Sequence, residues 1–565
     1  MSAAPLPSSP SRRIIPHLAK GLARPSGWVV AVLVLAGLVA LPVLAVAANL
    51  FAPSGAVWSH LAATVLPSYV LNSLWLMLGV GVGVGVGGVG TAWLVTLCRF
   101  PGSRTLEWAL LLPMAMPAYV VAYTYTGVME FSGPVQGALR ALFGWQTARD
   151  YWFPEIRSLG GAVWVMTMVL YPYVYILARA AFLEQSVCVL EASRTLGRRP
   201  WRAFTDVALP LARPAIAAGI ALALMETLND FGTVHYFAVD TFATGIYRTW
   251  MGMGQPAVAA QLGALLMLFV LALILVERVS RGAARAHHTS TRYRALPRIH
   301  LPGLRGGLAL VFCALPVVLG FGVPAGTLAV WAVGAETTTD GFAALAGNSL
   351  MLAGLTGALA VLVALVLAYA RRLHPSRLVG GAVRLASLGY AIPGGVIAVG
   401  TLVPLAALDK TVAGFLERHF GLSVGLLLTG SIAALIYAYL VRFLAVSANT
   451  VEASLAKVTP SMEAAARTLG LGTLATLRRV HAPIIRGSLL SAALLVFVDV
   501  MKELPATLII RPFNFDTLAT RTFTLASDER LADAALPALA IVAAGLLPVL
   551  LLSRAIARSR PGDHT

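Results

Sequence analysis

Arg194-Thr195-Leu196-Gly197 recurs in the second half of the chain as Arg467-Thr468-Leu469-Gly470. In both copies a proline follows the glycine at the same distance, at Pro210 and Pro483. Further matches at nearly the same offset flank this pair: Asn72-Ser73-Leu74 with Asn348-Ser349-Leu350, Pro117 with Pro393, and Asp240-Thr241-Phe242-Ala243-Thr244 with Asp516-Thr517-Leu518-Ala519-Thr520. Repetition at a nearly fixed offset indicates an internal duplication.

The composition excludes a soluble fold for most of the chain. Of the 565 residues, 58% are hydrophobic and 12% are charged, whereas soluble domains carry about 25% charged residues. Crossing a bilayer takes about 20 apolar residues, and twelve such stretches begin near residues 28, 70, 106, 159, 213, 257, 305, 344, 381, 424, 485 and 533. The sequence therefore predicts an all-α polytopic membrane protein with about 12 transmembrane helices. Because six spans return the chain to its starting side, the two six-helix repeats are parallel.

This duplication divides the chain into five expected parts. They are an N-terminal tail at 1–27, a first six-helix half at 28–277 with a core at about 68–277, a basic linker at 278–304, a second half at 305–556 with a core at about 344–553, and a C-terminal tail at 557–565. A pore between the halves is the expected working surface.

The net charge of +18 has a topological explanation. With the N-terminus inside, the predicted inner segments hold 31 Lys and Arg, including Arg442 in the segment 442–486, and the outer segments hold nine. Because Lys and Arg accumulate in cytoplasmic loops, both termini are expected in the cytoplasm. The basic excess then requires no nucleic-acid partner.

The repeated glycine lies in an inner loop of each half. Glu and Ala before a Gly stop, with a second short helix before the proline, predict a helix-turn-helix on the cytoplasmic face. These loops resemble the EAA motif of ABC importer permeases, which docks into a groove on an ATPase subunit. The resemblance assigns ATPase coupling to Glu191, Ala192, Ser193 and Gly197 in the first loop and to Glu463, Ala464, Ala465 and Gly470 in the second.

The second loop departs from the first in the position of its glutamate. Aligned on the glycines, Glu191 pairs with Ala464, so Glu463 stands one place earlier. One residue on a helix is a rotation of about 100°. The acidic contact of the second loop with an ATPase is therefore left open.

No nucleotide site is expected in this chain. None of the four lysines stands in the G-K-[ST] context of a phosphate-binding loop. Gly85, Gly87 and Gly90 satisfy G-x-G-x-x-G, but they lie in an apolar span with no strand before them. We interpret the run from Gly79 to Gly90 as a small-residue face for helix packing.

Four carboxylates lie inside predicted spans, where ionisable groups are costly and mark functional positions. Glu226 and Asp230 are four residues apart on one face of the fifth span, and Asp499 and Glu503 are the corresponding pair in the eleventh. One interpretation is that both pairs face the pore and offer hard oxygen ligands to a multivalent cation in transit. The other is that they cap broken helix ends or pair with Lys502, and so hold a gate shut without touching substrate.

Tyrosines in the third and fourth spans are a weaker candidate site. Their phenolic oxygens are potential ligands, but tyrosines in spans more often serve packing or lie at the interface. They are Tyr119, Tyr123, Tyr125, Tyr171, Tyr173 and Tyr175.

Two segments that contain these carboxylates carry a family resemblance. They are 226–233, continued by 241–250, and 502–507, continued by 511–513 and 515–519. In them, and across almost the whole chain, the sequence resembles the fused permeases of ferric iron ABC importers. The resemblance implies a non-enzymatic translocation subunit in a bacterial inner membrane, with no cofactor or resident metal of its own. It further implies that two copies of a cytoplasmic ATPase use ATP and that a periplasmic binding protein delivers Fe³⁺.

Two alternatives stay open at the level of sequence. Related fused permeases carry thiamine or phosphonates, so the same architecture admits another substrate. A twelve-span secondary transporter also has parallel six-span repeats, but that class usually carries G-x-x-x-D-R-x-G-R in the second-to-third loop. Here the loop reads Cys98-Arg99-Phe100-Pro101-Gly102-Ser103-Arg104, which favours the ABC permease.

Overall fold

The computed structural model describes residues 26–53, 55–184, 202, 204–281, 298–334 and 341–558. Within these ranges ten helices are long and apolar enough to cross a membrane. A bent pair, Ser103–Ala115 with Ala118–Phe143, passes the same test as one unit, and Ala535–Leu551 is a shorter apolar helix. The predicted all-α polytopic fold is confirmed, and the twelve expected spans correspond to the ten helices, the bent pair and the shorter helix.

The first half contains, in order, α1 (Gly27–Asn49), α2 (Gly55–Thr64), α3 (Leu66–Leu97), β1 (Cys98–Arg99), α4 (Ser103–Ala109), η1 (Leu112–Ala115), α5 (Ala118–Met129), α6 (Pro134–Phe143), α7 (Leu159–Glu184), η2 (Phe204–Ala208), α10 (Leu209–Asn229), α11 (Gly232–Tyr236), α12 (Phe242–Tyr247), η3 (Arg248–Gly252) and α13 (Pro256–Arg281).

The second half contains β2 (Ile299–His300), α14 (Gly303–Val317), η4 (Val318–Gly322), α15 (Val323–Gly334), α16 (Phe342–Leu373), α17 (Arg377–Ala386), η5 (Gly389–Ala391), α18 (Gly394–Phe420), α19 (Ile432–Leu455), α20 (Pro460–Thr468), α21 (Thr473–Thr476), η6 (Leu477–His481), α22 (Ala482–Met501), α23 (Pro505–Ile510), α24 (Leu518–Ser527) and α25 (Ala535–Arg558). The two short strands pair in parallel and join the two halves.

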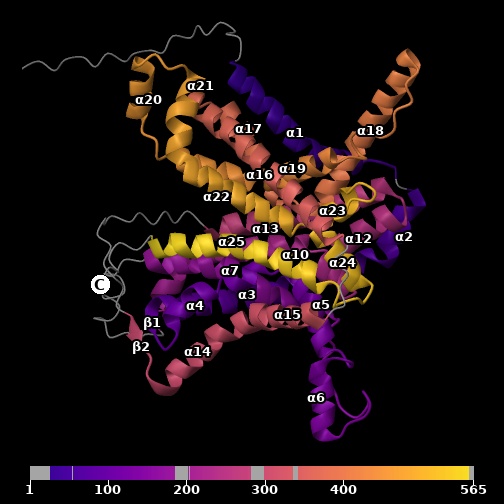
Figure 1. Ribbon diagram of the computed structural model, residues 1–565, viewed down its shortest axis with the longest axis vertical. Helices are drawn as coiled ribbons and strands as arrows, with labels where there is room; N and C mark the ends of the chain where they lie inside the picture. Colours follow the sequence, from indigo (N-terminus) through magenta and orange to yellow (C-terminus); the bar gives the residue numbers. More distant parts are fainter. Residues whose placement is uncertain are drawn as a thin grey trace, which may run out of the picture.

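Each half is built on three mutually packed helices. These are α3, α7 and α10 in the first half, and α16, α19 and α22 in the second, which form the lower and upper parts of Figure 1. The offset that relates Asn72 to Asn348 also relates the two ends of α3 to the two ends of α16. The duplication seen in the sequence is thus a duplication of the packed core.

The repeated polar motifs have the same task in both halves. Asn72 on α3 donates from Nδ2 to the carbonyl of Asp240 over 2.9 Å, and Asn348 on α16 does the same to Asp516 over 3.0 Å. The threonines that follow each aspartate form a capping box at the start of α12 and of α24. Side-chain acceptors at a helix start satisfy backbone N–H groups that otherwise lack partners. Asn-Ser-Leu and Asp-Thr therefore recur because they join a short helix to a long one, α12 to α3 in the first half and α24 to α16 in the second.

The glycine-rich run in α3 is a packing face, as interpreted from the sequence. A Cβ on Gly88 would lie 2.9 Å from the carbonyl oxygen of Tyr171 and from the amide nitrogen of Tyr175, both in α7. Only residues without a bulky side chain allow helices to approach this closely. A dinucleotide site is excluded here because the run lies inside one continuous helix.

The opening helix of each half packs on the other half. α1 contacts α16, α17 and α18, and Ser26 Oγ lies 2.7 Å from His374 Nε2. In return α14 contacts α3 and α4, α15 contacts α5, and the hydroxyl of Tyr125 donates to the carbonyl of Leu319 over 2.7 Å. The halves therefore interlock, and the domain boundaries drawn along the sequence are not boundaries between separate bodies. Those boundaries stay predictions.

The third and ninth predicted spans are each broken at the repeated proline. Met116 and Ile392 are extended, and new helices start after Pro117 and Pro393. Proline lacks a backbone N–H and disfavours helical geometry in the residue before it. The third span, predicted to begin near residue 106, therefore consists of two helical arms that meet at 92°.

Two boundaries in the second half also differ from expectation. The ninth span is Gly394–Phe420, preceded by the separate short helix α17, and does not begin near 381. The tenth begins at Ile432, not near 424, because the preceding segment is a loop fixed by Asp409. This buried carboxylate accepts from the amides of Leu428 and Thr429 over 2.9 to 3.2 Å.

The count of Lys and Arg in predicted inner segments wrongly included Arg442. It lies inside α19 and is 7% exposed, so it belongs to the membrane-spanning core and not to an inner loop. One misassigned arginine leaves the strong asymmetry between inner and outer segments intact.

Candidate translocation site

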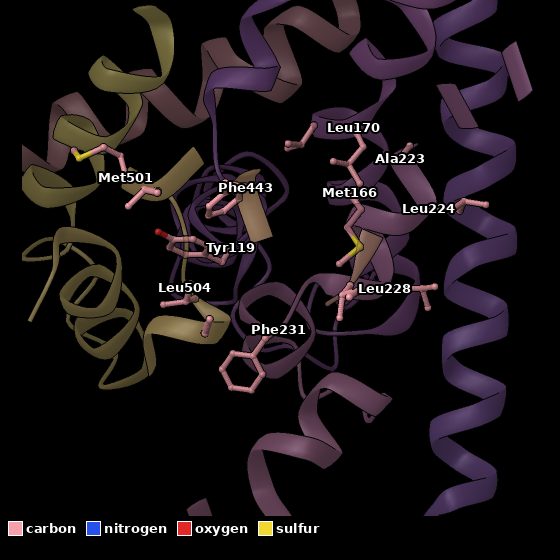
Figure 2. Packing of buried hydrophobic residues seen from close by; sticks show 14 of the residues in the cluster. Tyr119, Met166, Leu170, Ala223, Leu224, Leu228, Phe231, Phe443, Met501 and Leu504 are labelled. Atoms are coloured by element: carbon pink, nitrogen blue, oxygen red, sulfur yellow. The ribbon is translucent and has the colours of Figure 1, made fainter. Parts of the chain in front are cut away.

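One cavity between the halves is lined by all four carboxylates singled out from the sequence. Glu226 and Asp230 reach it from the end of α10, and Asp499 and Glu503 from the end of α22. It encloses about 900 Å³ of atom-free space, part of it open to solvent. Figure 2 shows apolar side chains of this region; those that line the cavity are Tyr119, Met166, Leu170, Phe231, Phe443 and Leu504.

Asp230 and Glu503 cap short helices. Asp230 accepts from the amides of Thr233 and Val234, in α11, over 2.9 and 3.3 Å. Glu503 accepts from the amides of Ala506 and Thr507, in α23, over 3.0 and 3.1 Å. Acceptors at a helix start are stabilising because they satisfy free N–H groups and complement the helix dipole. For these two residues, the capping interpretation of the sequence matches the geometry.

Glu503 also holds a buried arginine. Its Oε1 lies 3.1 Å from Nη1 of Arg442, and the two side chains are 1% and 8% exposed. A buried ion pair of this kind tolerates loss of either partner poorly, because the remaining charge is left without compensation. Arg442 thereby fixes the start of α23 against α19.

Asp499 and Glu226 differ in their pairing. Asp499 lies 3.1 Å from the ammonium of Lys502 on its own helix end. The carboxylate of Glu226 makes no hydrogen bond or ion pair with any described residue, although Lys502 of the opposite half lies within electrostatic range. Of the four carboxylates, Glu226 therefore contributes least to holding the fold together.

The cavity also gathers phenols from both halves. Tyr173 on α7 hydrogen-bonds Tyr390 in η5, and both lie near Glu226 and Asp499. Tyr119 is 5% exposed, and its hydroxyl has no hydrogen-bond partner among the described residues. Of the tyrosines considered from the sequence, Tyr119 and Tyr173 line the cavity, whereas Tyr123, Tyr125, Tyr171 and Tyr175 do not.

The charge of the lining is negative. Four carboxylates and two cations, Arg442 and Lys502, give a formal charge of −2. No three Asp, Glu, His or Cys side chains in the described ranges come close enough together to hold a metal ion. The lining thus has more acidic than basic side chains, but the described residues form no closed metal cage.

Aromatic rings close the space beside the cavity. Phe231, at the end of α10, lies 4.6 Å from Tyr247 and 5.6 Å from Phe523 of the second half, measured between ring centroids. His235 lies 5.5 Å from Phe523. The helices that carry Tyr247 and Phe523, α12 and α24, lie at the right of Figure 1, away from α20. Rings from both halves therefore meet on that side.

Of the two loops predicted to couple to an ATPase, the second lies within the described residues. α20 ends at Thr468, Gly470 adopts a left-handed φ of 79°, and α21 follows, which is the expected helix-turn-helix. Glu463 points inward: its Oε1 lies 2.6 Å from Nε of Arg372 and 3.2 Å from Nε2 of His481. Ala464 and Ala465 lie on the same short helix. The first-loop residues Glu191, Ala192, Ser193 and Gly197 lie outside the described residues.

Known proteins resemble the chain across this architecture. Residues 79–285 match the family model of the binding-protein-dependent transport system inner membrane component. The molybdenum transport system permease protein of Escherichia coli is 31% identical over 207 residues, which are 35% of this chain and 87% of that protein. The chain belongs to this family.

Two further relatives extend the similarity of this permease. The Fe(3+)-transport system permease protein FbpB 2 of Haemophilus influenzae is 27% identical over 492 residues, which are 86% of this chain and 89% of that protein. The sulfate transport system permease protein of Escherichia coli is 32% identical over 151 residues, which are 27% of the chain and 51% of that protein. Like these relatives, the chain is a permease, and its apolar helices make it a multi-pass membrane protein.

Several residues of the permease site were missed in the sequence. Arg442, Asn229 and Tyr390 line the cavity, and Arg372 anchors the coupling loop. The sequence around Arg442 could have identified it, because its neighbours on both sides are apolar. An arginine buried in a membrane span is expected to pair with an acidic side chain. Tyr390 and Arg372 have no such local signal, since their roles depend on contacts made far along the chain.

Proposed function

We propose that this permease is the translocation subunit of an ATP-driven importer of ferric iron in a bacterial inner membrane. The observation that carries the proposal is similarity over 86% of the chain to an Fe(3+)-transport permease. In this proposal a periplasmic binding protein delivers the ion, and a cytoplasmic ATPase homodimer hydrolyses ATP. The bias of Lys and Arg toward the inner segments supports cytoplasmic termini.

The charge of the cavity supports a cation as cargo. Relatives named for molybdenum and sulfate transport admit an oxyanion as the second candidate. An oxyanion would meet a lining with a formal charge of −2, in which Arg442 and Lys502 already face Glu503 and Asp499. Hard carboxylate and phenol oxygens suit a trivalent metal ion better.

The four carboxylates have two kinds of task in this proposal. Asp230 and Glu503 hold α11 and α23 in place, so they build the gate. Glu226, and Asp499 when it leaves Lys502, offer oxygens to the ion in transit. A translocation pathway has to bind its ion weakly enough to release it. A lining in which the described residues form no closed metal cage is consistent with such weak binding.

Alternating access then follows from movement of the halves. ATP binding and hydrolysis in the partner would move α20 and its first-half counterpart, and the long helices would transmit that movement to the cavity. The aromatic contact between Phe231 and Phe523 would part to admit the ion and close behind it. This chain supplies the pathway and the gate, and the partner supplies the energy.

Reconstitution tests the proposal. The permease, its cognate ATPase and the iron-loaded binding protein are placed in liposomes, and uptake of ⁵⁵Fe is followed with ATP or a non-hydrolysable analogue. ATP-dependent uptake of iron, with no uptake of molybdate or sulfate, is the expected result. Uptake driven by a proton gradient without ATP would overturn the ABC assignment, and ATP-dependent uptake of an oxyanion would overturn the choice of substrate.

A further inference from the structure

Glu463 has an internal role in the second coupling loop. It lies in the first turn of α20, its side chain is 16% exposed, and its Oε1 faces the guanidinium of Arg372 at 2.6 Å. We propose that Glu463 positions α20 by binding Arg372, and does not itself contact the ATPase. The inference rests on the proposed function, since it assumes that α20 docks an ATPase.

Arg372 connects three elements through one side chain. It stands near the end of α16, and besides Glu463 it donates to the carbonyls of Leu455 and Val458, at and beyond the end of α19. These carbonyls belong to a helix end, where acceptors lack partners within the helix. The planar guanidinium has several donors in a fixed arrangement, which lets it satisfy both carbonyls and the carboxylate. The start of α20 is therefore fixed relative to α16 and α19.

His481 packs this loop against the helix that lines the cavity, with its Nε2 3.2 Å from Oε1 of Glu463 but not hydrogen-bonded to it. It is 0% exposed, ends η6, and directly precedes α22, the helix that carries Asp499. Its ring meets that of Tyr369 edge to face at 5.2 Å, and the hydroxyl of Tyr369 donates to the carbonyl of Thr473 over 2.8 Å. A displacement of α20 is thus passed to the base of α22 through packed polar contacts.

The first half has different residues at the corresponding positions. Under the offsets that define the duplication, Arg372 corresponds to Thr96 and His481 to Ala208. Tyr369 corresponds to Trp93, whose ring lies 5.8 Å from Phe182 and 4.4 Å from Phe204. Among the described residues, an aromatic cluster therefore surrounds Trp93, the counterpart of Tyr369. The one-residue shift of Glu463 relative to Glu191 accompanies this difference.

Two readouts on the full transporter separate positioning from docking. The amount of cognate ATPase that co-purifies with the permease reports docking, and ATP-driven ⁵⁵Fe uptake in liposomes reports coupling. With Glu463→Gln we expect ATPase retention within about twofold of wild type and uptake reduced about tenfold, a loss typical of coupling between two sites. Arg372→Met should lower uptake at least as much, because it also removes the bonds to Leu455 and Val458. The double variant should be no worse than Arg372→Met alone, because both changes remove the same contact between Glu463 and Arg372.

Arg371→Gln is the matched control. Arg371 is the neighbouring residue and pairs with Glu452 on the surface, at 2.7 Å with the two side chains 37% and 44% exposed. Exposed pairs contribute little, so uptake should stay within about twofold of wild type. Should Glu463→Gln fail to fold, Arg372→Lys carries the same test, because it keeps the charge and loses the planar set of donors. The Arg372→Lys variant should retain the ATPase and show lower uptake than the wild type.

The outcomes distinguish this inference from the proposed function. If wild-type permease retains the ATPase but Glu463→Gln or Arg372→Lys releases it, Glu463 serves docking and the inference is wrong. Strictly additive losses in the double variant would also overturn it. If wild-type permease retains no ATPase at all, the proposed function itself fails. Glu191→Gln serves as the comparator, since a docking role is predicted for that glutamate.

Discussion

The backbone N–H of Gly394 donates a hydrogen bond of 2.6 Å to Oδ1 of Asn229 across the boundary between the two halves. Asn229 is the last residue of α10, and Gly394 is the first of α18, directly after the proline that breaks the ninth span. The symmetry-related partners are Lys502 and Ala118. The lysine side chain has no hydrogen-bond acceptor, so the equivalent hydrogen bond cannot form between Lys502 and Ala118. The interface between the halves is therefore asymmetric.

Replacing Asn229 with alanine should weaken this interface. The amide of Gly394 would stay buried without its acceptor, which costs about 1–3 kcal/mol. We expect a lower midpoint of thermal unfolding in detergent and ATP hydrolysis that is less tightly linked to uptake. Asn229→Asp is the matched variant, because it keeps an acceptor at a helix start. Equal losses in the Ala and Asp variants would show that the hydrogen bond is unimportant.

Replacing Glu226 with glutamine should impair transport without harming the fold. The carboxylate of Glu226 has no hydrogen bond or ion pair with a described residue, so its charge is available to the ion. We expect uptake to fall about tenfold, equivalent to about 1.4 kcal/mol of lost interaction, with unchanged thermal stability and ATPase retention. Glu417→Gln, at an exposed site on α18, controls for loss of one negative charge. Wild-type uptake by Glu226→Gln would remove this residue from the pathway.

Periodicity and repetition were enough to predict the architecture. Apolar length and the recurrence of Arg-Thr-Leu-Gly and Asp-Thr depend on local sequence, and they predicted the all-α polytopic fold, the repeated core and the second helix-turn-helix, although three spans differ from expectation in their course or start. The offset between the two Arg-Thr-Leu-Gly copies also paired Glu226 with Asp499 and Asp230 with Glu503, and all four line one cavity. A duplicated helix places equivalent residues on equivalent faces, so the pairing required no knowledge of contacts.

The different tasks of these carboxylates could not be predicted from the same pattern. Whether an acid caps a helix or faces the pore depends on where the next helix starts, and that is set at Phe231 and Leu504, which precede α11 and α23. The break at Pro117 could not be predicted for a related reason, because proline inside an apolar run is also common in continuous helices. α7 illustrates this, since it passes through Pro172 without interruption. Tertiary packing decides between these outcomes.

Replacing Tyr119 with phenylalanine separates a transport role from a packing role. Its buried hydroxyl has no partner among the described residues, so removing it should leave the thermal midpoint unchanged or slightly higher. We expect ⁵⁵Fe uptake to fall severalfold, because the cavity loses an oxygen. Tyr123→Phe removes an equally buried and unpartnered hydroxyl that does not line the cavity, and it should leave uptake unchanged. Equal uptake in both variants would argue against a role for Tyr119.

The buried pair of Glu503 and Arg442 should show strong coupling in a double-mutant cycle. Either Glu503→Gln or Arg442→Met leaves a buried partner uncompensated, at a cost of about 3–5 kcal/mol. In the double variant both charges are gone, so its loss should be clearly smaller than the sum of the single losses. Thermal unfolding of the purified permease measures the stability of the wild type, the two single variants and the double variant. The exposed pair of Arg371 and Glu452 is the reference, with an expected coupling below about 1 kcal/mol; additive losses at Glu503 and Arg442 would mean that the buried charges act independently.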